Sequence, residues 1–307
     1  MNRQGDSMVR SATSGQSTVH RVTGPGADPD LHLHVRDGRP LSIAVVSGKG
    51  GTGKSSLVAN LGVAMAEMGQ RVLLLDGDWG MGNVDLLLGL NAHDTLHDVL
   101  CGQRRPADIV LRGPAGIRVL PGASGSEELA NLDDYRCETL LRSVCGLVAR
   151  DDLLLIDTGP GLLRASLRLA QAADVILVLT TPEPTACADT CAVLRALAGR
   201  RLARAPRLVV NRARTAAEAR SVARRVHRWS APELGYAPDL IGVIPSDDTV
   251  TRAVWERRPF VLIDPDAPAS RGVRALAQRL LSEAPLPEVP ELRVTRDPRA
   301  TIAARAA

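Results

Sequence analysis

Residues 45–56 read VVSGKGGTGKSS, and the placement of glycine and lysine in this stretch decides the fold. The residues from Gly48 to Ser55 satisfy the pattern G-x-x-x-x-G-K-[ST], which is typical of a phosphate-binding loop. An apolar run at 41–47 precedes the loop, and residues 54–68 follow it with apolar side chains at helical spacing. The pattern therefore predicts a buried strand, a glycine-rich loop and a helix, in that order.

The loop has the chemistry that a polyphosphate requires. Its glycines lack Cβ atoms, so backbone N–H groups can close around an anion, and the next helix adds partial positive charge at its N-terminus. We expect Lys54 to bridge the β and γ phosphates and Ser55 to offer its hydroxyl to Mg²⁺. The predicted nucleotide contacts in the loop are Gly48, Lys49, Gly50, Gly51, Thr52, Gly53, Lys54, Ser55 and Ser56.

Lysine usage singles out two positions. The chain contains 38 lysine and arginine residues, yet Lys49 and Lys54 are its only lysines. A compact ammonium fits a cradle of backbone amides, whereas a planar guanidinium is too wide for it. This explains Lys54, but an ordinary phosphate loop makes no demand on position 49.

Composition narrows the class of protein. An apolar content of 45% supports a full hydrophobic core, and a net charge of +4 over 307 residues permits an acidic partner without requiring one. The five cysteines form no C-x-x-C pair, and the sequence has no signal-peptide pattern and no apolar run of membrane-spanning length. We therefore expect reduced thiols and a cytoplasmic location.

Apolar runs alternate with helical stretches from residue 41 onward. This order is typical of repeated β-α-β units, so we expect an α/β P-loop NTPase fold, with a mainly parallel sheet and helices on both faces in three layers. The predicted strands are 41–47, 71–76, 117–121, 152–157, 175–180, 207–211 and 240–245. The clearest predicted helices are 54–68, 133–149, 184–198 and 215–229.

The two ends of the chain differ from its middle. Residues 1–40 are rich in polar residues, glycine and proline, and we interpret them as a disordered leader. Residues 41–283 show no compositional break and are expected to form one ATPase domain. Residues 284–307 are expected to be a loosely ordered tail.

Two aspartates end apolar strands. Asp76 and Asp157 each close a run of apolar residues, and ligands of parallel sheets bind at the carboxyl ends of the strands. Capping of a following helix is the alternative role for each of them. Because Asp157 is followed by Thr-Gly-Pro-Gly, which cannot begin a helix at once, a mobile loop is the better interpretation there. We expect Ser55, Asp76 and Asp157 to form the metal site.

The segment KGGTGKS (49–55) resembles the deviant phosphate loop of the MinD/ParA ATPases. That family carries a second, signature lysine, which contacts the nucleotide bound by the other subunit of a dimer, and Lys49 matches it. The resemblance implies an Mg²⁺-dependent ATPase that is activated by homodimerisation, with ATP as its substrate and with Lys49, Lys54 and Asp78 as its catalytic residues.

The resemblance also implies roles for residues outside the loop. The stretch DGDWGMGNVD (76–85) resembles the family's first switch, in which an aspartate at the place of Asp78 orients the attacking water. DLLLIDTGPG (152–161) resembles the Walker B strand and second switch, which places Asp157 near Mg²⁺. Asn211 matches the position whose amide contacts the adenine edge.

Within this family, the middle of the chain resembles the flagellar-number regulators (the FlhG group). The resemblance rests on segments such as TLHDVL (95–100), GIRVLPGASG (116–125) and TPEPT (181–185). It implies control of flagellar placement or number, with an FlhF-like GTPase and basal-body switch components as partners. The Asp-Gln motif that activates such a GTPase is missing from the leader.

A peripheral contact with the inner membrane is implied for members that end in an amphipathic helix. The candidate helix 270–283 fits docking on the domain equally well, and 291–307 is interrupted by Pro298.

Three alternatives stay open within the same fold. The first is a MinD-like regulator of the division site. The second is a ParA-like partitioning ATPase that binds DNA, the weaker candidate partner, through arginines such as those between Arg220 and Arg228. The third is a non-catalytic pilus or localisation scaffold, against which the intact loop and aspartates argue.

Overall fold

The computed structural model describes residues 41–123, 125, 132–148, 153–200, 202, 204–234 and 236–283. The predictions for the leader at 1–40 and the tail at 284–307 lie outside these residues. The strands are β1 (Leu41–Ser47), β2 (Val72–Gly77), β3 (Leu111–Arg112), β4 (Arg118–Leu120), β5 (Leu153–Thr158), β6 (Val175–Thr180), β7 (Arg207–Ala213) and β8 (Leu240–Pro245).

The longer helices follow the strands in chain order. They are α1 (Lys54–Glu67), α5 (Asp134–Val148), α6 (Arg164–Ala172), α7 (Pro184–Ala198), α8 (Ala216–Leu234), α9 (Asp248–Glu256) and α11 (Pro268–Ser282). The short ones are α2 (Val84–Leu87), α3 (Leu96–Leu100) and α10 (Phe260–Ile263), with 3₁₀ turns at Pro106–Asp108 and Pro114–Gly116.

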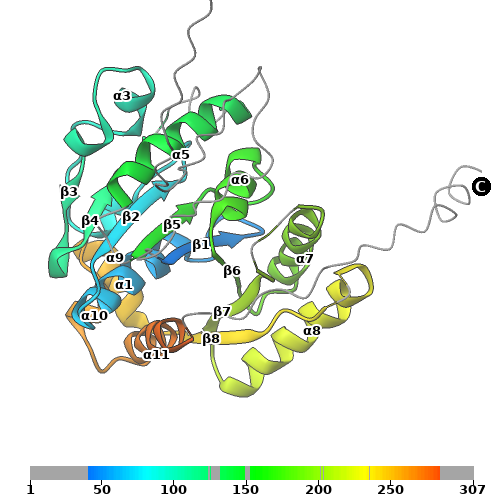
Figure 1. The fold of residues 1–307 in the computed structure, drawn as a ribbon. Helices are drawn as coiled ribbons and strands as arrows, with labels where there is room; N and C mark the ends of the chain where they lie inside the picture. Colours follow the sequence, from blue (N-terminus) through cyan, green and yellow to red (C-terminus); the bar gives the residue numbers. More distant parts are fainter. Residues whose placement is uncertain are drawn as a thin grey trace, which may run out of the picture.

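One eight-stranded sheet organises the described residues, in the order β3-β4-β2-β5-β1-β6-β7-β8. Every neighbouring pair is parallel except β3 and β4, which are antiparallel. Helices cover both faces (Figure 1), with α1, α10 and α11 on one side and α5 to α8 on the other. The expected three-layer α/β/α architecture is confirmed.

Side chains of the central strands alternate between two apolar layers. In β1, Ile43 and Val45 pack toward α1 and α11, whereas Ala44 and Val46 pack toward the layer of α6 and α7. All four are at most 2% exposed. Since both faces are covered, the central strands are continuous apolar runs, which is why the sequence revealed them clearly.

The seven predicted strands are confirmed within a residue or two of their ends. The eighth, β3, was not predicted because it contains only two residues and forms no apolar run. It is held by a tight turn before β4, in which Ala115 and Gly116 both have positive φ. The predicted helix 215–229 extends to Leu234.

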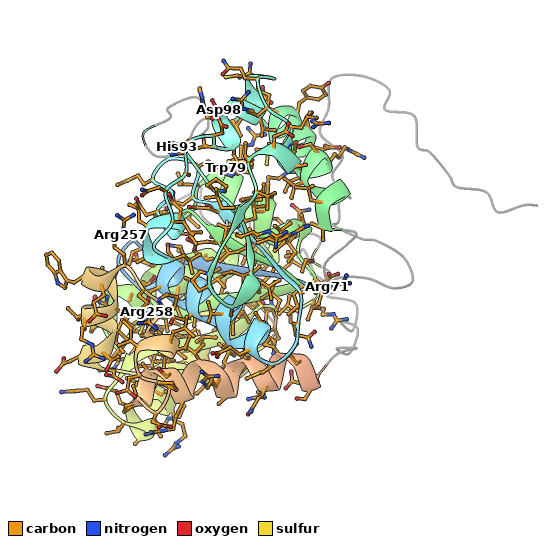
Figure 2. All side chains as sticks on the ribbon, turned by 90° about the vertical axis from the view of Figure 1, so that its left-hand side faces the viewer. Arg71, Trp79, His93, Asp98, Arg257 and Arg258 are labelled. Atoms are coloured by element: carbon orange, nitrogen blue, oxygen red, sulfur yellow. The ribbon has the colours of Figure 1, made fainter. Side chains whose placement is uncertain are left out.

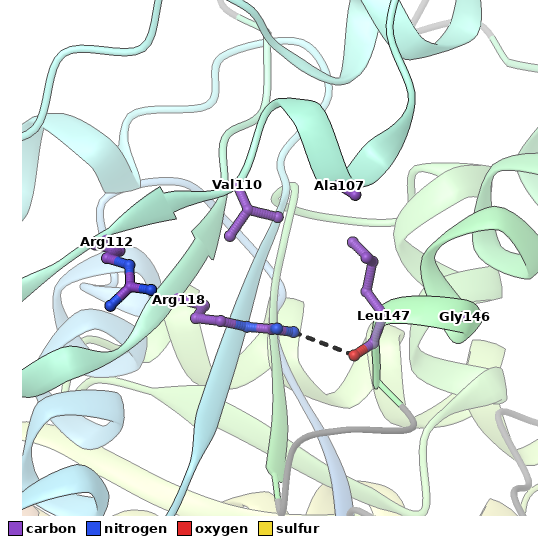
Figure 3. Close-up of a pocket in the computed structure, with 6 residues that line it drawn as sticks. All are labelled: Ala107, Val110, Arg112, Arg118, Gly146 and Leu147. Carbon is purple, nitrogen blue, oxygen red and sulfur yellow. Dashed lines mark hydrogen bonds between the residues drawn. The ribbon is translucent and has the colours of Figure 1, made fainter.

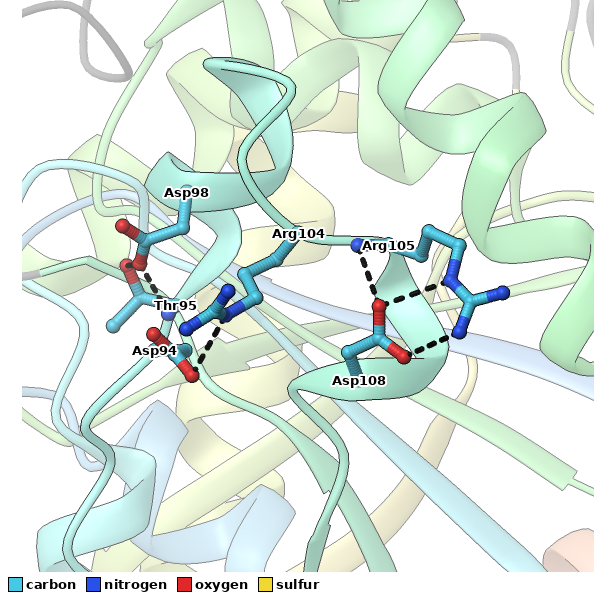
Figure 4. A network of polar contacts seen from close by, with 6 residues as sticks. All are labelled: Asp94, Thr95, Asp98, Arg104, Arg105 and Asp108. Atoms are coloured by element: carbon cyan, nitrogen blue, oxygen red, sulfur yellow. Dashed lines mark hydrogen bonds and ion pairs between the residues drawn. The ribbon is translucent and has the colours of Figure 1, made fainter.

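The β3–β4 edge is joined to neighbouring helices by polar contacts. Arg118 of β4 donates a hydrogen bond of 3.1 Å to the carbonyl of Leu147 in the last turn of α5 (Figure 3), which satisfies a group that the helix leaves open. In the segment before β3, Arg105 pairs with Asp108, and Thr95 caps α3 together with Asp98 (Figure 4). These contacts fix a segment that has few apolar residues.

The apolar face of the helix at 268–282 is buried in the domain. Val273, Leu276, Ala277 and Leu280 of α11 are at most 1% exposed and pack on α1 and β8, and Arg274 pairs with Glu67 of α1 at 2.7 Å. Of the two roles expected for this segment, docking on the domain is the observed one. Within the described residues, no helix is long and apolar enough to cross a membrane.

Replacing Leu276 with alanine should lower the free energy of unfolding by about 2–5 kcal/mol, because this side chain fills the space beside Gly242 of β8. Leu281→Ala, on the partly buried side of the same helix, should cost clearly less. Urea denaturation followed by circular dichroism measures both. Equal losses would show that α11 is not docked by this face.

Candidate functional site

The phosphate loop connects the carboxyl end of β1 to the N-terminus of α1. Gly51 and Gly53 adopt positive φ angles of 74° and 93°, which glycine accepts without strain. At Gly48 the constraint is space, since a Cβ there would lie 2.2 Å from the backbone of Asp189 in α7. The loop glycines therefore serve both the turn and a close contact with α7.

The two lysines of the loop have different surroundings. Lys54 is buried, at 7% exposure, in the first turn of α1, and Thr52 beside it is 2% exposed. The side chain of Lys49 is 32% exposed, and its ammonium contacts the Glu183 carboxylate and, at 3.2 Å, the Thr185 hydroxyl. Lys54 thus faces the interior of the loop, and Lys49 lies on its outside.

Two buried carboxylates lie next to the loop. Asp76 and Asp157 are register partners on the parallel strands β2 and β5 and are 1% and 0% exposed. Burial raises the pKa of Asp157 to about 6, against the lowering effect of the Lys54 ammonium. Burial, and then repulsion by Asp157, also raises the pKa of Asp76. When both carboxylates are ionised, the Lys54 ammonium compensates only one of their two negative charges.

The donor set at this point fits Mg²⁺. Both carboxylate oxygens of Asp157 are buried, and neither accepts a hydrogen bond of full geometry from the described residues, although the nearby Ser55 hydroxyl lowers the pKa of this carboxyl. Such orphaned oxygens are unfavourable unless a cation or its water shell satisfies them. Hard oxygen ligands from Asp157, Asp76 and Ser55 are the type that Mg²⁺ prefers. The residues expected to form the metal site therefore suit the ion.

Asp76 also holds the segment that follows β2. Its carboxylate accepts the backbone N–H groups of Asp78, at 3.2 Å, and of Val84, at 3.1 Å. The backbone of Gly82 passes so close that a Cβ there would lie 2.7 Å from an Asp76 oxygen. A change at Asp76 would therefore move the segment that carries Asp78.

The segment 78–84 is anchored at both ends and open at its tip. Trp79 and Val84 are buried, whereas Met81 between them is 71% exposed. Figure 2 shows Trp79 inside the molecule, beneath the outer segment that carries His93 and Asp98. The same figure shows Arg257, which follows α9 and donates hydrogen bonds to the carbonyls of Leu86 and Leu90 and so fixes the chain after this segment.

The loop after β5 meets the same site. The N–H of Gly161 donates to the carbonyl of Ser47 at 2.9 Å, which ties this loop to the start of the phosphate loop. A Cβ on Gly159 would lie 3.3 Å from an Asp78 oxygen and 3.2 Å from Leu163. Asp78 and Leu163 therefore both lie beside Gly159, and Leu163, like Leu162, is about half exposed.

A pocket of about 330 Å³ opens on the other side of the loop. It is lined by Gly53, Asn211, Pro245, Val254 and Phe260, among others, and combines apolar walls with a few polar groups. Asn211 donates from its side-chain amide to the carbonyl of Thr52 at 2.8 Å, so this amide fastens the end of β7 to the loop. Contact of Asn211 with an adenine stays a prediction.

The fold brings the predicted residues to one edge of the sheet. The loop, Asp76, Asp78 and Asp157 surround one site, and Asn211 lies at the neighbouring pocket. Sequence reasoning assigned no site role to Glu183 and Thr185, which contact Lys49. They lie in the TPEPT segment, whose likeness to flagellar regulators was the signal available in the sequence.

The free energy of unfolding of the nucleotide-free protein should decrease as pH rises from about 4 to about 6. A carboxyl whose pKa is raised on folding binds its proton more tightly in the native state, so its stabilisation is complete below the unfolded pKa and is lost above the folded one. The shift of Asp157 corresponds to a loss on the order of 3 kcal/mol. Asp157→Asn should flatten this slope, and an unchanged slope in urea titrations across this pH range would contradict the assignment.

Comparison with known proteins agrees with this geometry. A family model for the CobQ/CobB/MinD/ParA nucleotide binding domain matches residues 43–260. The antiactivator FleN of Pseudomonas aeruginosa is 35% identical over 248 residues, which cover 81% of this chain and 88% of FleN. The flagellum site-determining protein YlxH of Helicobacter pylori is 27% identical, over 78% of this chain and 82% of YlxH.

A solved structure shares the architecture. The septum site-determining protein MinD of Pyrococcus horikoshii, complexed with Mg-ADP, superposes with a TM-score of 0.65 at 29% identity, over 78% of this chain and 96% of MinD. Mg-ADP, the ligand of that MinD, is of the chemical class that a phosphate loop and buried carboxylates suit. From the matched domain and the 35% identity to FleN, we conclude that the chain belongs to the MinD/ParA family and is an ATPase whose cofactors are ATP and Mg²⁺.

Proposed function

We propose that this ATPase is a dimerisation switch that controls the number or placement of flagella. The coarser part of the proposal, regulation of where or how many cell structures form, is supported by relatives named for site determination at the flagellum and the septum. The flagellar part is supported by the likeness to YlxH, a flagellum site-determining protein. It is also supported by the 35% identity to FleN, which is higher than the 30% identity to the septum site-determining protein MinD of Bacillus subtilis. An FlhF-like GTPase and basal-body switch components are the proposed partners.

The observation that carries the switch proposal is the outward position of Lys49. Of the two loop lysines, only Lys54 is buried. The side chain of Lys49 lies on the outside of the loop and is about a third exposed. An ammonium at this place can reach an anion brought by a second subunit. Burying phosphates between two subunits is unfavourable until such charges compensate them. ATP would therefore favour a dimer in which each Lys49 completes the other subunit's site.

The residues of the site then divide the work of hydrolysis. Lys54 and the loop amides hold the phosphates, and Asp76 and Asp157 would hold Mg²⁺, which neutralises phosphate charge when bound. Asp78 would orient water, and Leu163, beside the same Gly159, would exclude bulk solvent once a second subunit covers it. Hydrolysis removes the anion that joins the subunits, so the dimer would separate.

Lys49→Ala should retain ATP binding but lose ATP-dependent dimerisation and most hydrolysis. Light scattering with a non-hydrolysable ATP analogue measures the dimer, and titration with a fluorescent nucleotide measures binding. Asp78→Ala is the companion variant, expected to dimerise with ATP and not to hydrolyse it. A Lys49→Ala protein that dimerises like the wild type would refute the switch.

One surface favours a second candidate function, binding of DNA as in partitioning ATPases. Four other arginines in or next to helices pair with a glutamate four residues away, in Arg142–Glu138, Arg214–Glu218, Arg252–Glu256 and Arg279–Glu283. On α8, by contrast, Arg220, Arg224 and Arg228 follow one another at this spacing and are exposed, with no ion pair to any described residue. Like charges at this spacing destabilise a helix, so an anionic partner would stabilise it.

The apolar residues of α8 disfavour a membrane as that partner. Ala219, Val222 and Val226 are at most 2% exposed in the domain core, and Trp229, at 41%, is the large apolar side chain that this helix exposes. One partly exposed side chain offers little apolar surface to lipid. A phosphodiester backbone requires only the charges.

A variant with glutamine at positions 220, 224 and 228 tests this candidate. If α8 contacts DNA phosphates in the ATP-bound state, the slope of log affinity against log salt should become shallower by about 3 for each subunit that binds, near 0.9 per lost contact. Arg252→Gln is the control, since that arginine is already paired with Glu256. A wild-type protein that binds no duplex DNA with ATP, in a gel-shift assay at low salt, would exclude the candidate.

A further inference from the structure

Lys49 is held within its own subunit by the start of α7. Its ammonium contacts the carboxylate of Glu183 and the hydroxyl of Thr185. The Lys49 ammonium is the main cause of a lowered pKa at Glu183, and Arg212 adds a smaller effect. Glu183 is therefore ionised and bound to the lysine on which dimerisation is proposed to depend.

Glu183 has a fixed position relative to the loop. It is the residue before the first turn of α7, and its carbonyl accepts the N–H of Cys187 at 3.1 Å. Asp189, two residues after Cys187 in α7, packs tightly on the phosphate loop. A Cβ on Gly48 would lie 2.2 Å from the backbone of Asp189. Because α7 and the loop are pressed together, the carboxylate stays within reach of Lys49 for as long as that lysine remains on its own subunit.

The Lys49–Glu183 pair is weak enough to be exchanged. The side chains of Lys49 and Glu183 are 32% and 53% exposed. An ion pair this exposed shifts the equilibrium between its paired and separated states by only about 1.4- to 5-fold. Lys49 can leave Glu183 when a stronger anion competes. The terminal phosphate of ATP in a second subunit is such an anion, whereas ADP offers less charge and lacks the outermost phosphate. Glu183 would also repel a facing nucleotide until Lys49 comes between them.

We propose that Glu183 is a positioning residue that raises the threshold for dimerisation, by competing with the facing nucleotide for Lys49. This inference rests on the proposed dimerisation switch and adds a residue to it. Thr185 assists by holding the ammonium beside the carboxylate. Without the carboxylate, Lys49 is free to contact the facing anion, so the protein associates more readily.

Glu183→Gln in the full chain tests the proposal, since the amide keeps the shape of the side chain and removes its charge. Analytical ultracentrifugation over a range of protein concentrations gives the dimer constant, with Mg-ADP and with the Mg²⁺ complex of a non-hydrolysable ATP analogue. Two pairs break per dimer when Lys49 moves to the facing nucleotide, so the variant bound to the ATP analogue should dimerise about 2- to 25-fold more tightly than the wild type. The gain with Mg-ADP should be no larger, because the weaker anion draws Lys49 from Glu183 less completely. Affinity for either nucleotide, measured by fluorescent-nucleotide titration, should stay unchanged.

Three controls separate this role from a structural one. Glu218→Gln removes a partly exposed negative charge that pairs with Arg214, and should leave both dimer constants unchanged. Thr185→Val should produce a smaller change in the same direction. Lys49→Ala combined with Glu183→Gln should remove the gain, because the released lysine is then missing.

The outcomes distinguish the two proposals. If the wild type does not dimerise with the ATP analogue, the switch itself fails. If the wild type dimerises but Glu183→Gln leaves the dimer constant with the ATP analogue unchanged or weakens it, only the role of Glu183 is overturned. A gain that persists without Lys49 would likewise overturn it.

Discussion

The site depends on an imbalance of buried charge. Parallel register places Asp76 opposite Asp157 at the end of two covered strands, and the nearest buried cation is the single ammonium of Lys54. Ionising both carboxylates beside one ammonium is unfavourable without a further cation, and the raised pKa values express this. Burial of the two carboxylates therefore makes the folded protein more stable when a metal and its nucleotide bind there.

The same carboxylates are linked to the two loops beside the site. Asp76 holds the backbone at Asp78 and Val84, and the loop after β5 is tied through Gly161 to the start of the phosphate loop. Both loops therefore adjoin the site directly. Each carries an exposed apolar residue, Met81 in one and Leu163 in the other. In the proposed switch, these loops would couple chemistry at the buried site to association over a few residues.

The two lysines illustrate how position changes the role of one side-chain type. Lys54 is buried beneath the loop, where a compact ammonium fits and a guanidinium would not. Lys49 lies outside the loop and is bound to Glu183, so its charge is already satisfied within the subunit. A cation in this situation responds to competition between anions and not simply to the presence of one. A facing triphosphate, with its greater charge, would therefore draw Lys49 from Glu183 more completely than a diphosphate.

The sequence by itself determined the fold class, the loop and the strand-end aspartates. These are local signals: apolar runs of strand length, glycine spacing and a carboxylate at the end of a run, each readable without knowledge of neighbours. It did not determine β3, because two residues form no period, nor the choice between docking and membrane contact for 268–282, because both bury the same apolar face. Only the tertiary structure decided that Asp76 and Asp157 are register partners, that Asn211 fastens β7 to the loop and that Lys49 rests on Glu183. These contacts join residues between 81 and 159 positions apart, and such pairs arise from strand order and helix packing, which local patterns do not contain.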